Sequence, residues 1–173
     1  GALGTGTVSL GSRSQLLGTT VGALDSLTGI TLQQTTSTAV LSNGWTNAAG
    51  LLTVDNGTVQ IGTAGVYGTV SIGSVIQNGG TIELDLGDSA VSADALIVSG
   101  DADFFGGQIL LKPASNPAGI TYDVLTYGGT LIAPPVVTAD AGRMVANVSN
   151  GSGFNDKVTV NFTGNSASLV WRG

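Results

Sequence analysis

Apolar and polar residues alternate strictly from Thr81 to Leu86, between two glycine-containing turns. The apolar side chains point to one side of an extended chain, whereas Glu83 and Asp85 point to the other. A period of two predicts a strand with one buried face. The same unit of turn, strand and turn recurs along most of the chain, and no helical period competes with it.

A short motif, Gly-Thr-Val-x-Leu/Ile-Gly, occurs three times, and a looser fourth copy overlaps the strand just described. The second and third copies start 11 residues apart, and the fourth starts 12 residues after the third. Such recurrence indicates a repeat architecture with a short, imperfect period. The four copies occupy residues 6–11, 57–62, 68–73 and 80–87.

We expect the copies to occupy equivalent strand positions. The apolar residues of the second and third copies should point inward, and the polar residue between them should point outward. The inward residues would be Val59, Ile61, Val70 and Ile72, and the outward ones Gln60 and Ser71.

Further short apolar runs fill the intervals between the copies. The run 95–100 is poor in polar residues, which predicts a strand buried on both faces. The other predicted strands are 16–21, 29–33, 39–41, 51–54, 107–111, 122–127, 144–148, 157–162 and 168–171.

Turn residues separate nearly all of these runs. Asn-Gly pairs begin at positions 43, 56, 78 and 150, and Gly-Gly pairs begin at 79, 106 and 128. Asn-Gly pairs are typical of antiparallel hairpins, whereas an evenly repeated motif favours parallel coils whose strands stack. We therefore predict an all-β chain in which residues 1–173 form one segment of a right-handed parallel β-helix (β-solenoid). Antiparallel hairpins remain an alternative for the C-terminal half.

The composition is typical of short strands, and it excludes several classes of function. Of 173 residues, 28 are glycine and only 9% are charged, which disfavours helices. The net charge of −6 offers no basic stripe for nucleic acid or for an anionic membrane. Cysteine and histidine are both absent, which excludes disulfides, thiol chemistry and a histidine base. No apolar run is long enough to span a membrane as a helix, so we expect no direct membrane insertion.

Two parts of the chain resemble the passenger segment of bacterial autotransporters, which use type V secretion. The opening Gly1–Leu10 resembles that family's short glycine-rich strand repeats. The runs 79–86, 94–100, 105–111 and 122–131 are similar to its C-terminal passenger coils. The resemblance implies a β-helix on the bacterial cell surface that serves adhesion, aggregation or display, and it carries no residue-level site.

Glu83 and Asp85 are the first candidates for chemistry, because they lie on one strand face about 7 Å apart by strand rise. Paired carboxylates at such spacing can act as the acid and base of a glycosidase. The other interpretation is a solvated strand face. We favour it, because the five basic residues are scattered and give no cluster of the kind that polysaccharide lyases use.

A second acidic group could hold Ca²⁺ through oxygen ligands. It comprises Asp88, Asp94, Asp101 and Asp103. The nonapeptide calcium repeat is not matched, and we expect these residues to be solvated loop acids. We therefore predict no catalytic, cofactor or metal residue, and no cofactor.

Exposed aromatic rings could stack on sugars, but we expect most of them in the core. Tyr122 and Tyr127 fall on opposite faces of one predicted strand, so we expect at least one to be exposed. The remaining aromatic residues are Trp45, Tyr67, Phe104, Phe105, Phe154, Phe162 and Trp171. Glycan acceptor motifs at Asn56, Asn147, Asn150 and Asn161 are interpreted as turn residues in a bacterial protein.

These observations favour a structural and adhesive module of an extracellular, bacterial cell-surface protein rather than an enzyme. The alternatives are a fibre segment of a phage or another surface protein, and a polysaccharide-acting β-helix enzyme. We expect the chain to be an excerpt of a longer repetitive protein. Its partners would be a host or neighbouring-cell ligand or a copy of itself. End-to-end contact would use the uncapped apolar residues Leu3, Val170 and Trp171.

Overall fold

The computed structural model describes residues 6–11, 15–18, 28–114 and 117–164, with only the backbone path for 15–18. Its stacked parallel coils form a β-solenoid of about five turns, and strands make up most of the described residues. No helix occurs among the described residues, so none there could cross a membrane. The all-β prediction is confirmed.

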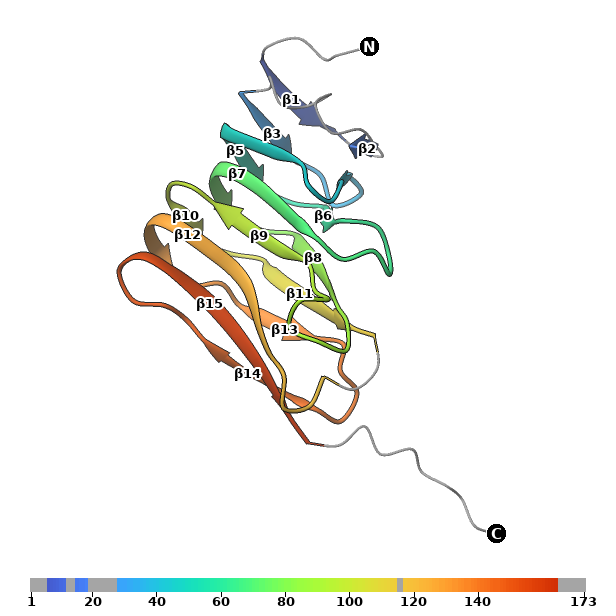
Figure 1. Cartoon of the computed structure of the whole chain (residues 1–173). Coiled ribbons are helices and arrows are strands. Elements are labelled where there is room, and N and C mark those ends of the chain that lie inside the picture. Colours follow the sequence, from blue (N-terminus) through green and yellow to red (C-terminus); the bar gives the residue numbers. More distant parts are fainter. Residues whose placement is uncertain (1–5, 12–14, 19–27, 115–116, 165–173) are drawn as a thin grey trace.

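The described part of the chain contains fifteen strands, which make up the coils (Figure 1). The first seven are β1 (Thr7–Leu10), β2 (Gln15–Gly18), β3 (Gly29–Leu32), β4 (Thr38–Leu41), β5 (Thr46–Val54), β6 (Thr58–Ile61) and β7 (Thr69–Gln77). The next are β8 (Thr81–Leu86), β9 (Ala95–Val98), β10 (Ala102–Phe104), β11 (Gln108–Pro113), β12 (Thr121–Ala133), β13 (Val137–Ala139), β14 (Val145–Ser149) and β15 (Phe154–Thr163).

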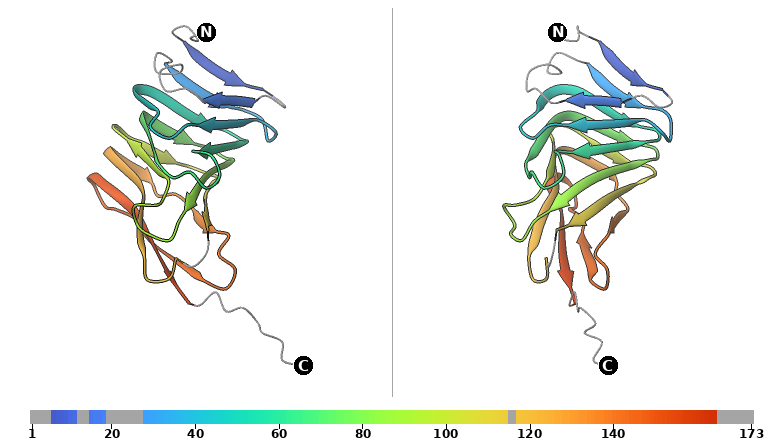
Figure 2. Two further views of the ribbon diagram at one scale, coloured as in Figure 1. Left: turned by 45° about the vertical axis from the view of Figure 1, so that its right-hand side comes forward. Right: turned by 90° about the vertical axis from the view of Figure 1, so that its right-hand side faces the viewer.

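The strands form two sheets that face each other across the core (Figure 2). The first sheet follows the order β1-β3-β5-β7-β10-β12-β15-β14, with β9 pairing with both β7 and β12. The second follows β13-β11-β8-β6-β4-β2. Up to β13 the chain passes back and forth between the sheets, and strands of successive coils pair in parallel. This is the stacking that the repeated motif predicted.

In the first sheet, β7 and β12 each bend at a glycine, and a glycine between β9 and β10 lies in the same stack. We call these stacked residues, Gly73, Gly100 and Gly129, the glycine corner. The N–H of Gly100 donates to the carbonyl of Gly73 at 2.7 Å, and that of Gly129 donates to Gly100 at 2.8 Å. A Cβ on Gly73 would lie 2.7 Å from the carbonyl oxygen of Gly50, in the coil before. The coils approach so closely here that no side chain fits.

A second corner joins the first sheet to the second and is formed by the turns before β6, β8 and β11. Gly57, Gly80 and Gly107 each adopt positive φ there, at 84°, 68° and 74°. The Asn-Gly pairs at 56 and 78 therefore turn a corner between parallel coils and do not form hairpins. In the first of these turns the left-handed residue is the glycine of the Asn-Gly pair, Gly57, whereas in the second it is Gly80, one residue beyond the pair.

The motif copies are only partly equivalent, which corrects the sequence-based expectation. Copies 6–11 and 68–73 lie in the first sheet as β1 and the start of β7. Copies 57–62 and 80–87 lie in the second sheet as β6 and β8. A spacing of 11 residues is thus about half a coil, because each sheet contributes one strand per turn. The motif describes a strand between two glycine corners, whichever sheet holds it.

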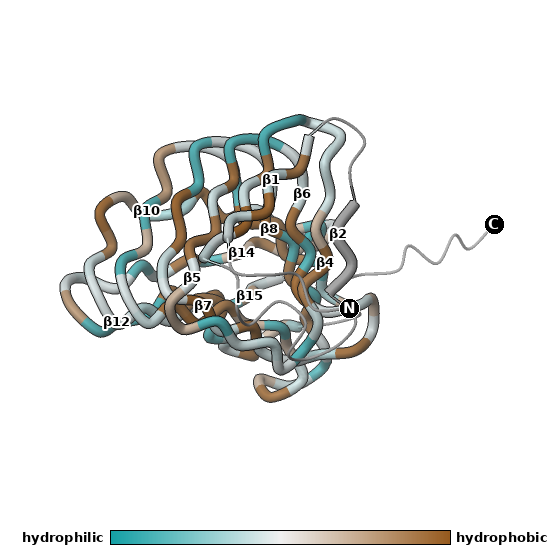
Figure 3. Tube along the Cα trace, turned by 90° about the horizontal axis from the view of Figure 1, so that it is seen from above, coloured by the Kyte–Doolittle hydropathy of each residue, from teal (hydrophilic) through white to brown (hydrophobic). Residues whose placement is uncertain are grey.

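The predicted inward and outward directions are confirmed. Val59, Ile61 and Val70 have no exposed surface, and Ile72 is buried. Gln60 and Ser71 are half-buried on the outer side. Equivalent inward positions stack from coil to coil, and Figure 3 shows the hydrophobic parts of the strands gathered around the middle of the stack. One such row, in register, is Leu10, Leu32, Val54, Gln77 and Phe104.

The polar residue in that row, Gln77, is fully buried. Its Nε2 donates to the carbonyls of Gly80 and Gln108, at 3.3 and 3.1 Å. An amide can therefore replace a hydrophobic side chain here, because it bonds the backbone of the second corner in two coils at once.

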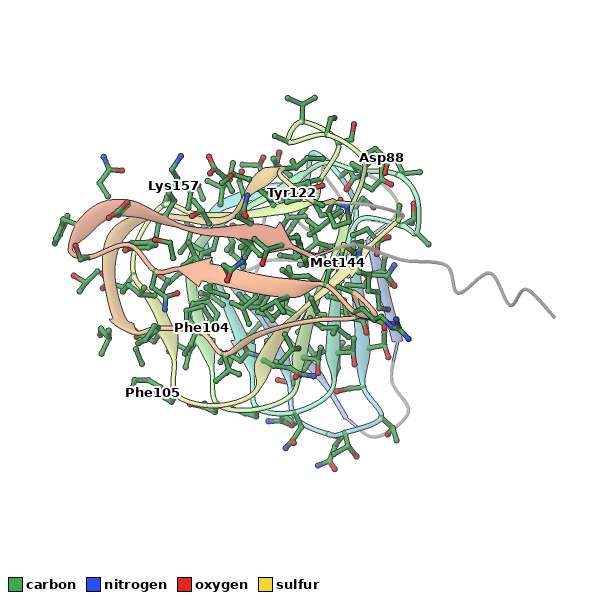
Figure 4. All side chains as sticks on the ribbon, turned by 90° about the horizontal axis from the view of Figure 1, so that it is seen from below. Asp88, Phe104, Phe105, Tyr122, Met144 and Lys157 are labelled. Carbon is green, nitrogen blue, oxygen red and sulfur yellow. The ribbon has the colours of Figure 1, made fainter. Side chains whose placement is uncertain are left out.

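The last strands leave the parallel pattern, as the sequence left open. β15 pairs antiparallel with β12 and with β14. Figure 4, seen from below, shows β14 and β15 running in opposite directions across the end of the stack. Val158, Val160 and Phe162 on the inner side of β15 have no exposed surface. Between them, Thr159 and Asn161 are only half-buried. The inner side of β15 therefore covers part of the apolar interior, while Val145 and Val148 of β14 and Phe154 of β15 are exposed.

One prediction about a single strand is wrong, and another falls on residues that the structure does not describe. The run 95–100 is not buried on both faces, because Ile97 of β9 is 36% exposed while Leu96 and Val98 are buried. The strand predicted at 168–171 lies outside the described residues, as do Leu3, Val170 and Trp171, on which the expectation of uncapped ends rested.

Candidate functional site

The most regular surface lies on the outer face of the second sheet, where equivalent side chains of successive coils stand in register. Thr38, Thr58, Thr81 and Gln108 follow one another from β4 to β11. Neighbouring strands lie about 4.8 Å apart, which sets the spacing of the row. At its end Thr138 Oγ1 and Gln108 Oε1 are 3.0 Å apart. We call Thr38, Thr58, Thr81 and Gln108 the polar row.

Glu83, beside the polar row, is held in an ion pair. Lys112 Nζ lies 2.6 Å from Glu83 Oε2, and the two side chains are 43% and 18% exposed. The lysine belongs to β11, one coil further along. A surface pair of this kind stabilises the fold by less than about 1 kcal/mol. The sequence placed Glu83 on a strand face, and the structure adds the cation that neutralises it.

Asp85, the other candidate, takes part in a different structure, the loop corner that joins the second sheet to the first. Its Oδ2 accepts a hydrogen bond from the N–H of Gly65 at 3.3 Å. Its backbone is paired with Asp94: the N–H of Asp85 donates to Asp94 Oδ2 at 3.0 Å, and the N–H of Asp94 donates to the Asp85 carbonyl at 2.8 Å. Glu83 and Asp85 therefore bond to different coils and do not act on a shared space.

Asp94 is fully buried. Its Oδ1 accepts the N–H of Gly68 at 2.9 Å, so one carboxylate joins the loop 62–68 to the loop 87–94 of the next coil. Burial raises the pKa of Asp94 to about 6, against the two backbone hydrogen bonds, which lower it, and the nearby charge of Asp85 raises it further. The expectation of a solvated loop acid is wrong for this residue.

Asn43 completes the same corner from the coil before. Its Nδ2 donates to the carbonyl of Val66 at 2.6 Å, while its Oδ1 is buried without a hydrogen-bond partner. A Cβ on Gly62 would lie 2.5 Å from Asn43 Oδ1 and 3.1 Å from Asp94 Oδ1, so both oxygens face this glycine. Alternation could not reveal this cluster, because its members lie in loops of unequal length between the strands.

The other acids proposed for calcium lie apart from Asp94. Asp101 follows the glycine corner, and its Oδ1 accepts the N–H of Thr130 at 2.8 Å. Asp103 lies on β10, where burial, followed by the charge of Asp101, raises its pKa. Asp88 lies in the exposed loop after β8. Within the described ranges no three carboxylates gather as metal ligands would.

Most aromatic rings lie in the core, as expected, but the two tyrosines of β12 correct a prediction. Tyr122 and Tyr127 are both fully buried. The pairing of β12 with β15 shifts register between Asp123 and Leu125, which places Val124 and Leu125 both inward. This bulge changes the phase of the alternation, so residues five apart reach the same side.

The other aromatic residues differ in exposure. Trp45, Phe104 and Phe162 are also buried, and Tyr67 is half-buried. Phe105 and Phe154 are exposed, at 62% and 76%, and Figure 4 shows Phe105 at the outer edge of a corner. Trp171 lies outside the described residues.

The described surface has no pocket to enclose a small molecule. Its outstanding features are the polar row, the exposed aromatic residues and the tightly bonded corners. No protein-family model, no curated protein and no solved structure matches this chain.

Proposed function

We propose that this chain is a structural and adhesive module, similar to an autotransporter passenger, that works outside a bacterial cell by extending and displaying a repetitive polar surface. The polar row carries the proposal. Its side chains stand at the spacing of the strands along four coils, and such a row suits repeated weak contacts with a surface rather than enclosure of one ligand. The resemblance of the glycine-rich runs to passenger segments supports the same function.

The proposal assigns no catalytic role to the acids. Glu83 is paired with Lys112, and Asp85 and Asp94 accept backbone hydrogen bonds. These bonds fasten one coil to the next, which suits a stiff spacer. The partners that we propose are a ligand on a host or neighbouring cell and a further copy of this chain.

The test is to anchor the 173-residue chain on a non-adherent bacterium and to measure cell aggregation and attachment to host-cell and abiotic surfaces. The variant Thr58→Lys/Thr81→Lys interrupts the polar row on the second sheet. Thr31→Lys/Thr53→Lys places the same charges in register on the first sheet, where these threonines are also half-buried. We expect the first variant to lose adhesion and the second to keep it. Absence of adhesion in the unchanged chain, or equal loss in both variants, would contradict the proposal.

Self-association is tested separately, by sedimentation velocity of the isolated chain over a wide range of concentrations. End-to-end contact through the C-terminal residues predicts a concentration-dependent species that Trp171→Asp removes. A sharp monomer throughout, unchanged by Trp171→Asp, would refute such contact and would leave the adhesion experiment unaffected.

A further inference from the structure

The four Asn-Gly pairs share one chemical weakness. The backbone nitrogen after an asparagine can attack that asparagine's Cγ, and glycine permits the approach because it has no Cβ. The reaction requires an N–H that is not held in a hydrogen bond and a backbone that can rotate. The four pairs differ in how the fold restrains the glycine N–H and the surrounding backbone.

Two pairs have the attacking N–H engaged across coils. The N–H of Gly44 donates to the carbonyl of Thr69 at 2.8 Å, and that of Gly79 donates to Val54 at 3.1 Å. The side-chain amide of Asn78 also donates to Asp55 Oδ1 at 2.8 Å. Attack at either pair would first require a corner to open, which is a local unfolding event.

The pair at Asn56 is fixed by its neighbours on both sides. The N–H of Asn56 donates to the carbonyl of Leu32 at 3.1 Å, and the carbonyl of Gly57 accepts the N–H of Thr81 at 2.8 Å. Gly57 is buried, with φ at 84°. Its peptide cannot rotate while both coils are in place.

Asn150 differs from these three. Asn56 and Asn78 are exposed too, but their side-chain amides donate hydrogen bonds to Gln33 and Asp55. Asn150 lies exposed in the turn between β14 and β15, and among the described residues neither its side chain nor the N–H of Gly151 makes a hydrogen bond. The turn is anchored just beyond, where Asp156 Oδ2 accepts the N–H of Ser152 at 2.9 Å. Gly151 itself packs against buried groups, since a Cβ there would lie 2.6 Å from the Tyr127 hydroxyl.

We propose that Asn150 is a site of spontaneous, water-dependent modification, selected by the fold from four equivalent sequence motifs. The Gly151 nitrogen forms a bond to Asn150 Cγ, the bond from Cγ to Nδ2 breaks, and ammonia leaves with the proton of the Gly151 N–H. Water then opens the resulting succinimide at one of its two carbonyls. The products are aspartate or an isoaspartyl linkage at position 150.

Either product changes the strand pair that covers the end of the solenoid. A new carboxylate arises near Asp156, and like charges repel. The isoaspartyl product also inserts one extra atom into the backbone of the turn that joins β14 to β15. Conversion at Asn150 therefore weakens the hairpin while leaving the corners of the earlier coils intact.

The experiment is to incubate the folded chain in mildly alkaline buffer and to quantify conversion at all four sites by peptide mass spectrometry. Hydroxylamine serves as the probe for the succinimide, because it cleaves the chain after the affected residue. The same chain in concentrated urea is the internal control, since unfolding removes every protecting hydrogen bond. Asn150→Gln is the matched variant, because its longer side chain forms the corresponding ring far more slowly.

We expect conversion at position 150 to exceed that at 43, 56 and 78 by at least about tenfold in the folded chain, because opening a corner requires local unfolding. The four rates should become similar in urea, and cleavage after residue 150 should disappear in Asn150→Gln. Conversion at 43 or 78 as fast as at 150 in the folded chain would overturn the proposal. The proposal would also be overturned if folding slowed conversion at Asn150, relative to urea, by the same factor as at the corner sites.

Discussion

The carboxylate of Asp94 accepts the N–H of Gly68 at 2.9 Å and so joins loops that are 26 residues apart in the chain. Because Asp94 is fully buried, the stability of the fold depends on whether its carboxyl group is protonated or ionised. This single contact fastens one coil to the next at the corner that has the longest loops.

Asp94 should make the protein less stable as pH rises from about 4 to about 6. Its pKa is raised from 3.8 to about 6 in the folded chain, so the folded state binds the proton more tightly than the unfolded state does. The resulting stabilisation is complete below the unfolded value and is lost as pH rises through the folded value. A shift of this size corresponds to about 3 kcal/mol at most.

The measurement is the free energy of unfolding by urea as a function of pH, in the unchanged chain and in Asp94→Asn. The difference between the two curves should change between about pH 4 and pH 6 and be flat above. Asp140→Asn is the control at an exposed acid. A pH dependence that is the same in all three proteins would contradict this assignment.

The glycine corner should not tolerate a methyl group. Gly73→Ala places a Cβ 2.7 Å from the carbonyl oxygen of Gly50 and 2.8 Å from that of Ala48, so backbone must move. We expect a loss of about 1–3 kcal/mol. Gly11→Ala is the control, because nothing lies within 4 Å of its Cβ, and it should change stability by less than about 0.5 kcal/mol. Equal melting temperatures of the two variants would show that the coils are not packed this closely.

Two tyrosines on one strand should respond oppositely to loss of the hydroxyl. Tyr122 donates to the carbonyl of Gly87 at 2.6 Å, whereas the buried hydroxyl of Tyr127 has no hydrogen-bond partner. Tyr122→Phe should cost about 1–3 kcal/mol, because it leaves a buried carbonyl unsatisfied. Tyr127→Phe should be neutral or stabilising. The check is chemical denaturation, and a larger loss for Tyr127→Phe would reverse the assignment.

A charge inside the first sheet should be far more harmful than one outside it. Ile72→Asp buries a carboxylate among apolar side chains and should cost several kcal/mol. Ser71→Asp, at the adjacent half-buried position, should cost less than about 1 kcal/mol. Thermal unfolding followed by circular dichroism compares them directly, and similar shifts in melting temperature would mean that the inward and outward directions are misassigned.

The sequence alone predicted most of the described strands, the buried face of the repeated motif and the stacking of coils. Alternation acts within one strand, so it directly identified Val59, Ile61 and Val70 as inward residues. Glycines at regular intervals marked the corners, because only a residue without Cβ fits where coils approach so closely.

Only the tertiary structure decided what each corner and loop does. The spacing of 11 residues did not show that successive copies lie in different sheets, and the Asn-Gly pairs did not show which of them turn a corner and which closes a hairpin. The bulge of β12 depends on its pairing with β15, and one carboxylate oxygen of Asp94 is held by Gly68, 26 residues away. Local pattern contains no information about such contacts, because bulges and loop lengths change the phase of the alternation without changing the residues themselves.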